Sequence, residues 1–308
     1  MKITFALAAS FATLAAVSYA APGRPPITGV SHIAVLSADM AKSDAFYVND
    51  LGGVKRDDPE NTAGVRYYFS PIQFVEVLPL PAADAASKNR MDHVAFDTPD
   101  ADGLRRYLRA NGIAVPHRVK RAGDGSKWFD LKDPEDNTIQ FVQPPAAPEA
   151  VPANPLSKHL IHFGFIVHNR DLEDTFYRKV LGFRPYWYGG MTADKPQWIA
   201  QQVPDGTDWL EYMVVSGPET KGIPATMPQA TSGVLNHFSL GVVNMEQTVN
   251  LLTAGERISD KNDGPKIGRD GKWQFNMYDP DGTRAELMEL QPSTKPCCSP
   301  FTASSPTE

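Results

Sequence analysis

The sequence predicts an α+β protein in which four similar modules pair into two domains. The segments that open at His32 and His162 each carry Phe-Tyr 14 residues later and a glycine 20 residues later, at Gly52 and Gly182. The stretch 125–142 partly repeats 271–290, with an Asp-Pro turn before a short strand pattern in each. A stretch with five prolines, 144–155, separates the two halves. A repeat at this spacing indicates a duplicated structural unit.

The start of each module predicts a strand, then a helix, then a glycine stop. In the third module Leu172, Phe176 and Val180 lie at helical spacing and indicate an amphipathic helix. The second and fourth modules open at His93 and His237 with the same plan, and we expect Thr98 and Asn244 to cap their helices.

The end of each module predicts a strand with one polar side chain. The separations from opening histidine to closing polar residue are 44 (32 to 76), 47 (93 to 140), 49 (162 to 211) and 49 (237 to 286). Side chains alternate between the faces of a strand, so Glu286 and Glu289 point to opposite sides. Alignment with Gln140 selects Glu286 as the inward residue.

The N-terminal stretch 1–20 predicts a cleavable signal peptide, because Lys2 precedes an apolar run and Ala20 ends a small-residue cleavage site. We therefore expect a secreted or periplasmic protein. The remaining chain divides into a first domain at 28–143 (modules 28–79 and 90–143), a proline-rich linker at 144–156 and a second domain at 157–291 (modules 157–216 and 233–291). Residues 292–308 are rich in Pro, Ser and Thr and predict a disordered tail.

The formal net charge is −6, and no basic run stands out. We therefore expect neither nucleic acid nor an anionic membrane surface as a partner, and no apolar stretch is long enough for a membrane span. Cys297 and Cys298 are adjacent, which leaves a vicinal disulfide or intermolecular pairing open. The oligomeric state is not determined by these patterns.

Together, the histidine openings and the DPDG-x-x-x-E closing resemble the vicinal oxygen chelate superfamily, which includes glyoxalase I, methylmalonyl-CoA epimerase, bleomycin-resistance proteins and extradiol dioxygenases. The resemblance covers roughly residues 28 to 291. It implies four βαβββ modules, paired so that each domain is a curved, open mixed sheet around a cleft. It also implies a metal ion in that hollow.

Carried over position by position, the resemblance places four ligands in the second domain: His162, Glu211, His237 and Glu286. The corresponding set in the first domain is His32, Glu76, His93 and Gln140, in which one carboxylate has become an amide. Mixed nitrogen and oxygen donors suit a divalent transition metal such as Fe, Zn, Ni, Mn or Co. We therefore expect the stronger site in the second domain.

Three functions fit these residues, and each would act on a small molecule. A lyase or isomerase of the glyoxalase and epimerase kind would use Glu211 and Glu286 as the catalytic carboxylates. An extradiol dioxygenase would use His162, His237 and Glu286 to hold Fe(II), but Asn276 stands where that pattern has a tyrosine and residues 238–286 contain no histidine. A non-enzymatic binding protein is the third possibility.

The remaining histidines and the aromatic residues allow plainer interpretations. His168 lies about 20 Å along its strand from His162, too far to share a site. His159 and His117 lie in loop-like contexts and are expected to be solvated. The aromatic residues of the third module suit either sheet packing or the wall of a cleft for a planar substrate; they are Tyr186, Trp187, Tyr188, Trp198 and Trp209.

Overall fold

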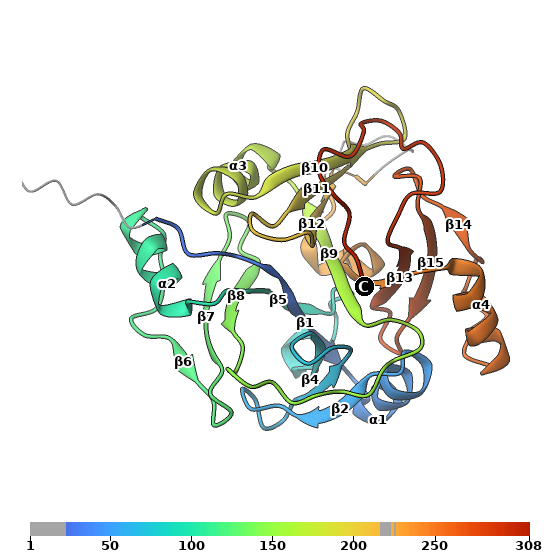
Figure 1. Cartoon of the computed structure of the whole chain (residues 1–308), viewed down its shortest axis with the longest axis horizontal. Helices are drawn as coiled ribbons and strands as arrows, with labels where there is room; N and C mark the ends of the chain where they lie inside the picture. The colour runs from blue at the N-terminus through green and yellow to red at the C-terminus, as the bar shows by residue number, and fades with distance from the viewer. Residues whose placement is uncertain (1–22, 216–222, 225) are drawn as a thin grey trace, which may run out of the picture.

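The computed structural model describes residues 23–215, 223–224 and 226–308. The predicted signal peptide, 1–20, lies outside these residues. No helix in the described part of the chain is long and apolar enough to cross a membrane. Figure 1 shows the blue-to-green first half beside the yellow-to-red second half.

The first half forms one mixed sheet of eight strands, in the order β2-β3-β4-β1-β5-β8-β7-β6. Its two opening strands pair antiparallel, and each pairs in parallel with the closing strand of its own module. The strands are β1 (Gly29–Ser37), β2 (Val54–Asp57), β3 (Val65–Tyr68), β4 (Phe74–Pro79), β5 (Met91–Asp97), β6 (Lys120–Arg121), β7 (Lys127–Lys132) and β8 (Thr138–Gln143).

The second half repeats this sheet in the order β10-β11-β12-β9-β13-β16-β15-β14. The predicted fold of four βαβββ modules, paired within each half, is therefore confirmed. The strands are β9 (His159–Val167), β10 (Arg184–Gly189), β11 (Trp198–Gln202), β12 (Trp209–Val214), β13 (His237–Val242), β14 (Lys266–Ile267), β15 (Trp273–Tyr278) and β16 (Arg284–Glu289).

Each module has one helix between its first and second strands. These are α1 (Met40–Asp44), α2 (Ala101–Ala110), α3 (Arg170–Asp174) and α4 (Met245–Ala254). Asn244 caps α4 as predicted, but α2 is capped by Asp100, whose carboxylate accepts from the Gly103 amide, so the expectation for Thr98 is wrong.

The predicted helical stripe of the third module is only partly correct. After α3 the chain continues as a π-helical turn over Thr175–Val180, which shifts the buried face. Phe176 and Tyr177 are buried, whereas Leu172 is 50% exposed. Gly182 follows with a positive φ of 82°, the conformation that glycine adopts at helix ends.

Two tyrosines from the repeated Phe-Tyr pairs join the halves. The Tyr47 hydroxyl donates to Asp279 Oδ2 at 3.0 Å, and the Tyr177 hydroxyl donates to Asp133 Oδ2 at 3.2 Å. Each aspartate begins the Asp-Pro turn of a module in the other half. One continuous hydrophobic core contains buried residues from both sheets. The repeat thus includes an equivalent pair of contacts across the interface between the halves.

The segment 144–156 connects the sheets without a helix or strand. The C-terminal end of this segment packs against the first half and is not fully solvated. The Asn154 amide donates to the Leu51 carbonyl at 2.8 Å, and Leu156 is 5% exposed.

The prediction that residues 292–308 are disordered is wrong. This segment runs along β10, where the Thr302 amide donates to the Tyr186 carbonyl and the Cys298 amide to the Tyr188 carbonyl. The Phe301 ring packs 4.9 Å from the Tyr186 ring. An edge strand offers unpaired backbone groups, and one aromatic anchor holds the segment against it. Figure 1 shows this dark red segment crossing the second half. Within it, Cys297 and Cys298 form the vicinal disulfide.

Candidate metal centre

The second centre consists of His162, Glu211, His237 and Glu286, which come from four neighbouring strands. Antiparallel pairing of β9 and β13 sets His162 opposite Ser239 and His237 opposite Gly164. This register brings the two Nε2 atoms to 3.2 Å from each other. Gly164 is needed at this point, because a Cβ there would lie 2.4 Å from His237 Cε1. The sequence did not indicate this role for Gly164.

The two carboxylates lie on opposite sides of the histidine pair. Glu286 Oε2 is 3.4 Å from His162 Nε2, and Glu211 Oε2 is 3.4 Å from His237 Nε2. Glu286 is 5% exposed and points to the face shared with Met288, as the strand alternation predicted. Glu289 instead accepts a hydrogen bond from the first amide of α4. The structure therefore brings all four predicted residues of the second domain together.

The imidazoles of this centre are held in the neutral form that binds a cation. Burial lowers the pKa of His162 well below its usual value, and the positive charges of Lys272 and Arg284 add to the effect. Burial likewise lowers the pKa of His237, with Arg284 and His162 contributing. His237 Nδ1 lies 2.8 Å from the Leu235 carbonyl, so a proton on Nδ1 leaves the Nε2 lone pair free for a metal.

Neither carboxylate of this centre forms an ion pair with a lysine or arginine of the described residues, although the charge of Arg284 is close enough to lower the pKa of both. Burial raises the pKa of Glu211 to about 8, and repulsion from Glu286 is the next cause. Burial also raises the pKa of Glu286 to about 7. Two unpaired carboxylates beside two neutral imidazoles form a set of donors that a divalent cation would neutralise.

The spacing of the donors fits a metal ion. Ligand atoms about 2.1 Å from an ion lie about 3.0–3.4 Å from their neighbours in octahedral or tetrahedral geometry. The observed separations of 3.2, 3.4 and 3.4 Å match that range. The ligand atoms of His162, Glu211 and His237 all lie close to one another, whereas Glu286 lies near His162 but outside that mutually close group.

A cavity of about 530 Å³ opens onto the second centre and is lined by both of its carboxylates. Aromatic side chains form much of its wall, including all of those noted in the third module except Tyr188, which is 41% exposed and does not line the cavity. Phe301 from the C-terminal segment completes the wall. The aromatic residues thus both pack within the sheet and border the cavity.

A buried lysine supports this wall. Lys272 is fully buried, and its ammonium group lies 4.8 Å from the centre of the Trp209 ring. The Trp209 ring in turn stacks on His162 at 4.6 Å. Burial lowers the pKa of Lys272 to about 8. In the sequence Lys272-Trp273 recurs as Lys127-Trp128, and this repeated pair is the only signal that singles out Lys272.

The first centre brings together His32, Glu76 and His93. Their separations are 3.0 Å between the two Nε2 atoms, and 3.8 and 3.4 Å from these atoms to Glu76 Oε2. Gln140 also lies there, but its amide donates to Glu60 and Asp130 at 3.0 Å each. The amide nitrogen at the fourth predicted position is therefore engaged, whereas the carbonyl Oε1 of Gln140 is buried and accepts no hydrogen bond from the described residues.

A buried arginine already occupies the hollow of the first domain. Arg66 is 3% exposed, pairs with Asp58 at 3.0 Å and Glu60 at 2.6 Å, and lies over the Phe74 ring. Burial raises the pKa of Glu76 to about 10, and neighbouring Asp58 adds to this effect. A resident positive charge and a carboxyl that favours its neutral form both weaken this centre for a metal ion.

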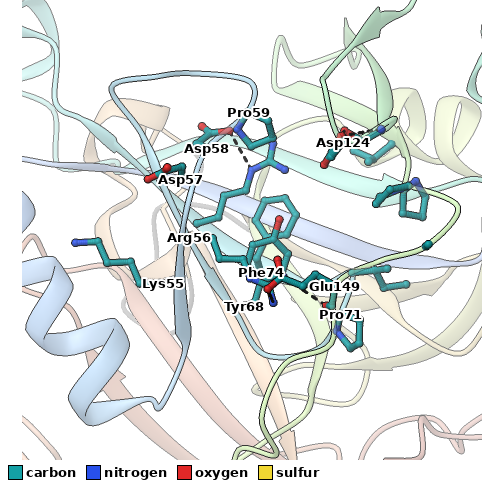
Figure 2. A pocket seen from close by; sticks show the side chains of 17 residues that line it. Lys55, Arg56, Asp57, Asp58, Pro59, Tyr68, Pro71, Phe74, Asp124 and Glu149 are labelled. Atoms are coloured by element: carbon teal, nitrogen blue, oxygen red, sulfur yellow. Dashed lines mark hydrogen bonds and ion pairs between the residues drawn. The ribbon is translucent and has the colours of Figure 1, made fainter.

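The large cavity of the first domain does not include the first centre in its lining. This cavity, of about 640 Å³, is bordered by charged side chains and by the linker. Figure 2 shows Lys55, Asp57 and Asp58 on one side and Asp124 on the other, with the rings of Tyr68 and Phe74 between them. The two domains thus differ in whether a cavity reaches the ligand set.

The other histidines stand apart from both centres. His168 lies beside Glu135, with Nδ1 2.8 Å from its carboxylate. His117 is exposed, as expected. His159 is not simply solvated, because its ring lies 2.8 Å from Asp208 Oδ1 and 2.7 Å from the Thr307 carbonyl. His159 therefore helps to hold the C-terminal segment.

Solved structures with a similar fold include two 2,3-dioxygenases and a glyoxalase. The 2,3-dioxygenase LapB from Pseudomonas sp. KL28 aligns with a TM-score of 0.63 at 18% identity, over 90% of this chain and 97% of that one. The Mn(II)-bound glyoxalase from Novosphingobium aromaticivorans aligns with a TM-score of 0.63 at 15% identity, over 86% and 83%. Homoprotocatechuate 2,3-dioxygenase from Arthrobacter globiformis aligns with a TM-score of 0.61 at 16% identity, over 88% and 82%.

These likenesses concern the fold. No curated protein sequence gave a match to the chain. The sequence itself matches the Glyoxalase/Bleomycin resistance protein/Dioxygenase superfamily over residues 29–141 and 159–287, which cover most of both domains. With its four modules, two curved sheets and repeated histidine strands, the chain belongs to this superfamily.

Proposed function

We propose that the protein is a metal-dependent lyase or isomerase of the glyoxalase type, and that its active site is the second centre. The observation that carries this proposal is the fourth donor. Glu211 lies 3.4 Å from His237, on the far side of the histidine pair from Glu286. A ring-cleaving dioxygenase holds its iron with two histidines and one carboxylate and has no need of that second acid.

A bound divalent ion would act as a Lewis acid on a carbonyl or enediolate oxygen of the substrate. His162 and His237 would hold the ion through their Nε2 atoms. Glu211 and Glu286 both line the cavity, so either carboxylate can take a proton from a substrate carbon and return it to the neighbouring carbon. Glu211 is the more accessible of the two, with a side chain 15% exposed against 6% for Glu286.

The alternative function is extradiol ring cleavage of a catechol. Its support is that Glu286 lies beside the histidine pair, with Oε2 3.4 Å from His162 Nε2, and that two of the similar structures are 2,3-dioxygenases. Against it, Asn276 occupies the position of the expected tyrosine and pairs directly with Glu286 across β15 and β16.

Metal binding and proton exchange test the proposal. After removal of metals, we expect about one equivalent of Mn(II), Ni(II) or Zn(II) per chain on reconstitution. His162→Ala should lose this metal, whereas the matched variant His32→Ala in the first centre should keep it. The reconstituted protein should then exchange the α-proton of 2-hydroxyacetophenone with deuterated water, followed by NMR, and Glu211→Gln should stop that exchange.

Three results would redirect this assignment. Less than about half an equivalent of bound metal would leave a small-molecule binding protein. Oxygen uptake with catechol in the Fe(II) form would favour ring cleavage. Retention of metal by His162→Ala together with loss in His32→Ala would move the site to the first domain.

We also propose that the protein is exported, because residues 1–20 have the pattern of a signal peptide. Mass spectrometry of the mature protein should then find an N-terminus at Ala21. A mature protein that still carries residues 1–20 would contradict export by this route.

A further inference from the structure

One cation in the second cavity has no partner. Arg284 lines this cavity and lies on the same face of β16 as Glu286, two residues away or about 7 Å along the strand. Its Nε is buried without a hydrogen bond, and its guanidinium makes no hydrogen bond or ion pair with any residue of the described chain. A guanidinium offers five donors, so an unpaired one beside a cavity calls for an acceptor.

The other cations that line this cavity are already engaged. Lys266 pairs with Asp263 at 2.7 Å and is half-exposed. Arg269 donates to the Gly190 carbonyl at 3.1 Å and to Cys297 Sγ at 3.0 Å, so it holds the C-terminal segment. Only Arg284, among the cations of this lining, keeps all of its donors free of described residues.

Two acids that interact with the charge of Arg284 are the carboxylates of the second centre. Neither forms an ion pair with Arg284, although both lie close enough to interact with its charge. In the proposed function Glu211 and Glu286 hold a metal ion, which draws their charge away from the guanidinium. The free donors of Arg284 then face whatever molecule enters the cavity.

The wall of the cavity indicates the shape of that molecule. Tyr186, Trp187, Trp198 and Trp209 come from β10, β11 and β12, on the side of the sheet across from β16, and Phe301 closes the wall. Aromatic side chains pack best against flat apolar groups. The cavity volume of about 530 Å³ is ample for one aromatic ring system.

We propose that Arg284 binds the anionic group of the substrate, and that the substrate is an aromatic carboxylate. Its ring lies against the aromatic wall, and its carboxylate accepts two parallel hydrogen bonds from the guanidinium. The spacing of Arg284 and Glu286 places the reacting carbon within a few atoms of the carboxylate. This inference rests on the proposed function, because it takes the second centre as the reaction site.

Calorimetric binding to the Zn(II)-loaded protein tests this inference without any turnover. The probes are 2-naphthoate, its neutral analogue 2-naphthamide, and acetate, which has the charge but no ring. We expect 2-naphthoate to bind at least tenfold more tightly than either of the others. Arg284→Gln should weaken 2-naphthoate binding about 10- to 100-fold, as expected for loss of charge-assisted hydrogen bonds, and leave 2-naphthamide unchanged within threefold.

Two further variants distinguish a specific contact with Arg284 from a general effect of positive charge in the cavity. Lys266→Gln removes one positive charge from the same cavity and should change 2-naphthoate binding less than threefold. Arg284→Lys keeps the charge but loses the planar fork, so it should fall between wild type and Arg284→Gln. Near-UV circular dichroism establishes that each variant is folded, and Arg284→Lys keeps the test decisive if Arg284→Gln does not fold.

The inference fails if naphthoate and naphthamide bind equally, if 2-naphthoate does not bind, or if Lys266→Gln weakens naphthoate as much as Arg284→Gln does. It also fails if Arg284→Gln leaves naphthoate binding intact, since the probe would then bind at the metal alone. Zinc content is measured separately. Loss of zinc in the wild type contradicts the proposed function, whereas retained zinc without naphthoate selectivity contradicts only the role of Arg284.

Discussion

Removing one hydroxyl group at the interface between the halves should lower the free energy of unfolding more at Tyr47 than at its repeat counterpart, Tyr177. Both tyrosines are fully buried, and each donates to an aspartate of the other half. Replacement by phenylalanine keeps the ring, so the aromatic contact of Tyr47 with Tyr67 at 5.1 Å remains. The perturbation is therefore limited to one hydrogen bond to a carboxylate.

The two carboxylates differ in what remains after the change. Asp133 keeps hydrogen bonds to both oxygens, because Asn137 Nδ2 still donates to Oδ2 at 2.8 Å. Asp279 keeps two backbone donors, but both bond Oδ1, and Oδ2 has no other hydrogen bond from the described residues. A hydrogen bond to a charged group contributes about 1.5–3 kcal/mol, and a bare buried acceptor reaches the upper end. We expect Tyr47→Phe to lower the free energy of unfolding by about 2–3 kcal/mol and Tyr177→Phe to lower it by about 1–2 kcal/mol.

The cost of Tyr47→Phe should also depend on pH. Burial raises the pKa of Asp279 to about 6, above its usual 3.8. The contribution of this group to stability is therefore fully present below about pH 4 and is lost as the pH rises through about 6. The Tyr47 hydroxyl opposes that loss, because its hydrogen bond favours the ionised carboxylate. The variant should lose more stability at pH 8 than at pH 5.

Urea unfolding followed by tryptophan fluorescence at pH 5 and pH 8 measures these differences, with Tyr177→Phe as the matched control. Equal costs for the two variants at pH 8 would refute the account of the bare Oδ2. A cost for Tyr47→Phe that does not rise between pH 5 and pH 8 would show that Asp279 does not change its ionisation state in the folded protein over this range.

Three other changes probe the second centre and its cover. Glu286→Gln should lower Zn(II) affinity at least about 100-fold in a chelator competition, while Glu289→Gln on the opposite face should change it little; equal losses would show that the strand parity is wrong. Gly164→Ala should displace the His237 ring and cost about 1–3 kcal/mol of stability together with most of the bound metal, and an unchanged metal content would refute that steric account. Phe301→Ala should destabilise the protein by about 1–3 kcal/mol, measured by urea unfolding, and no effect would mean that the C-terminal segment does not pack on Tyr186.

Much of the fold and of the second centre could be predicted because both depend on short-range patterns. The repeat of histidine, Phe-Tyr and glycine marks the start of a module wherever it occurs. The alternation of side chains along β16 separates Glu286 from Glu289 without knowledge of any partner strand. The same alternation could not show that Gln140 would bond Glu60 and Asp130, because these contacts depend on how a loop and a neighbouring strand pack.

The wrong predictions arose where composition or local spacing was used without knowledge of the tertiary contacts. The C-terminal segment has the Pro, Ser and Thr content of a disordered tail, yet a free strand edge and the Tyr186 ring give it partners. Leu172 followed a helical period, but a π-helical turn moved the buried face to Tyr177. For the C-terminal segment, a local preference was overridden by groups distant in the chain.

The sequence by itself determined the four modules, their pairing and the histidine and polar positions that come together in each half, since each follows from spacings of a few tens of residues. Only the tertiary structure decided which ligand set meets a cavity and which cation there stays free. Arg66 is neutralised by Asp58 and Glu60 in the first domain, whereas Arg284 has no such partner in the described chain. The physical reason is that an ion pair depends on distance in space. Tyr47 and Asp279, 232 residues apart in the chain, meet only because two sheets pack around one core.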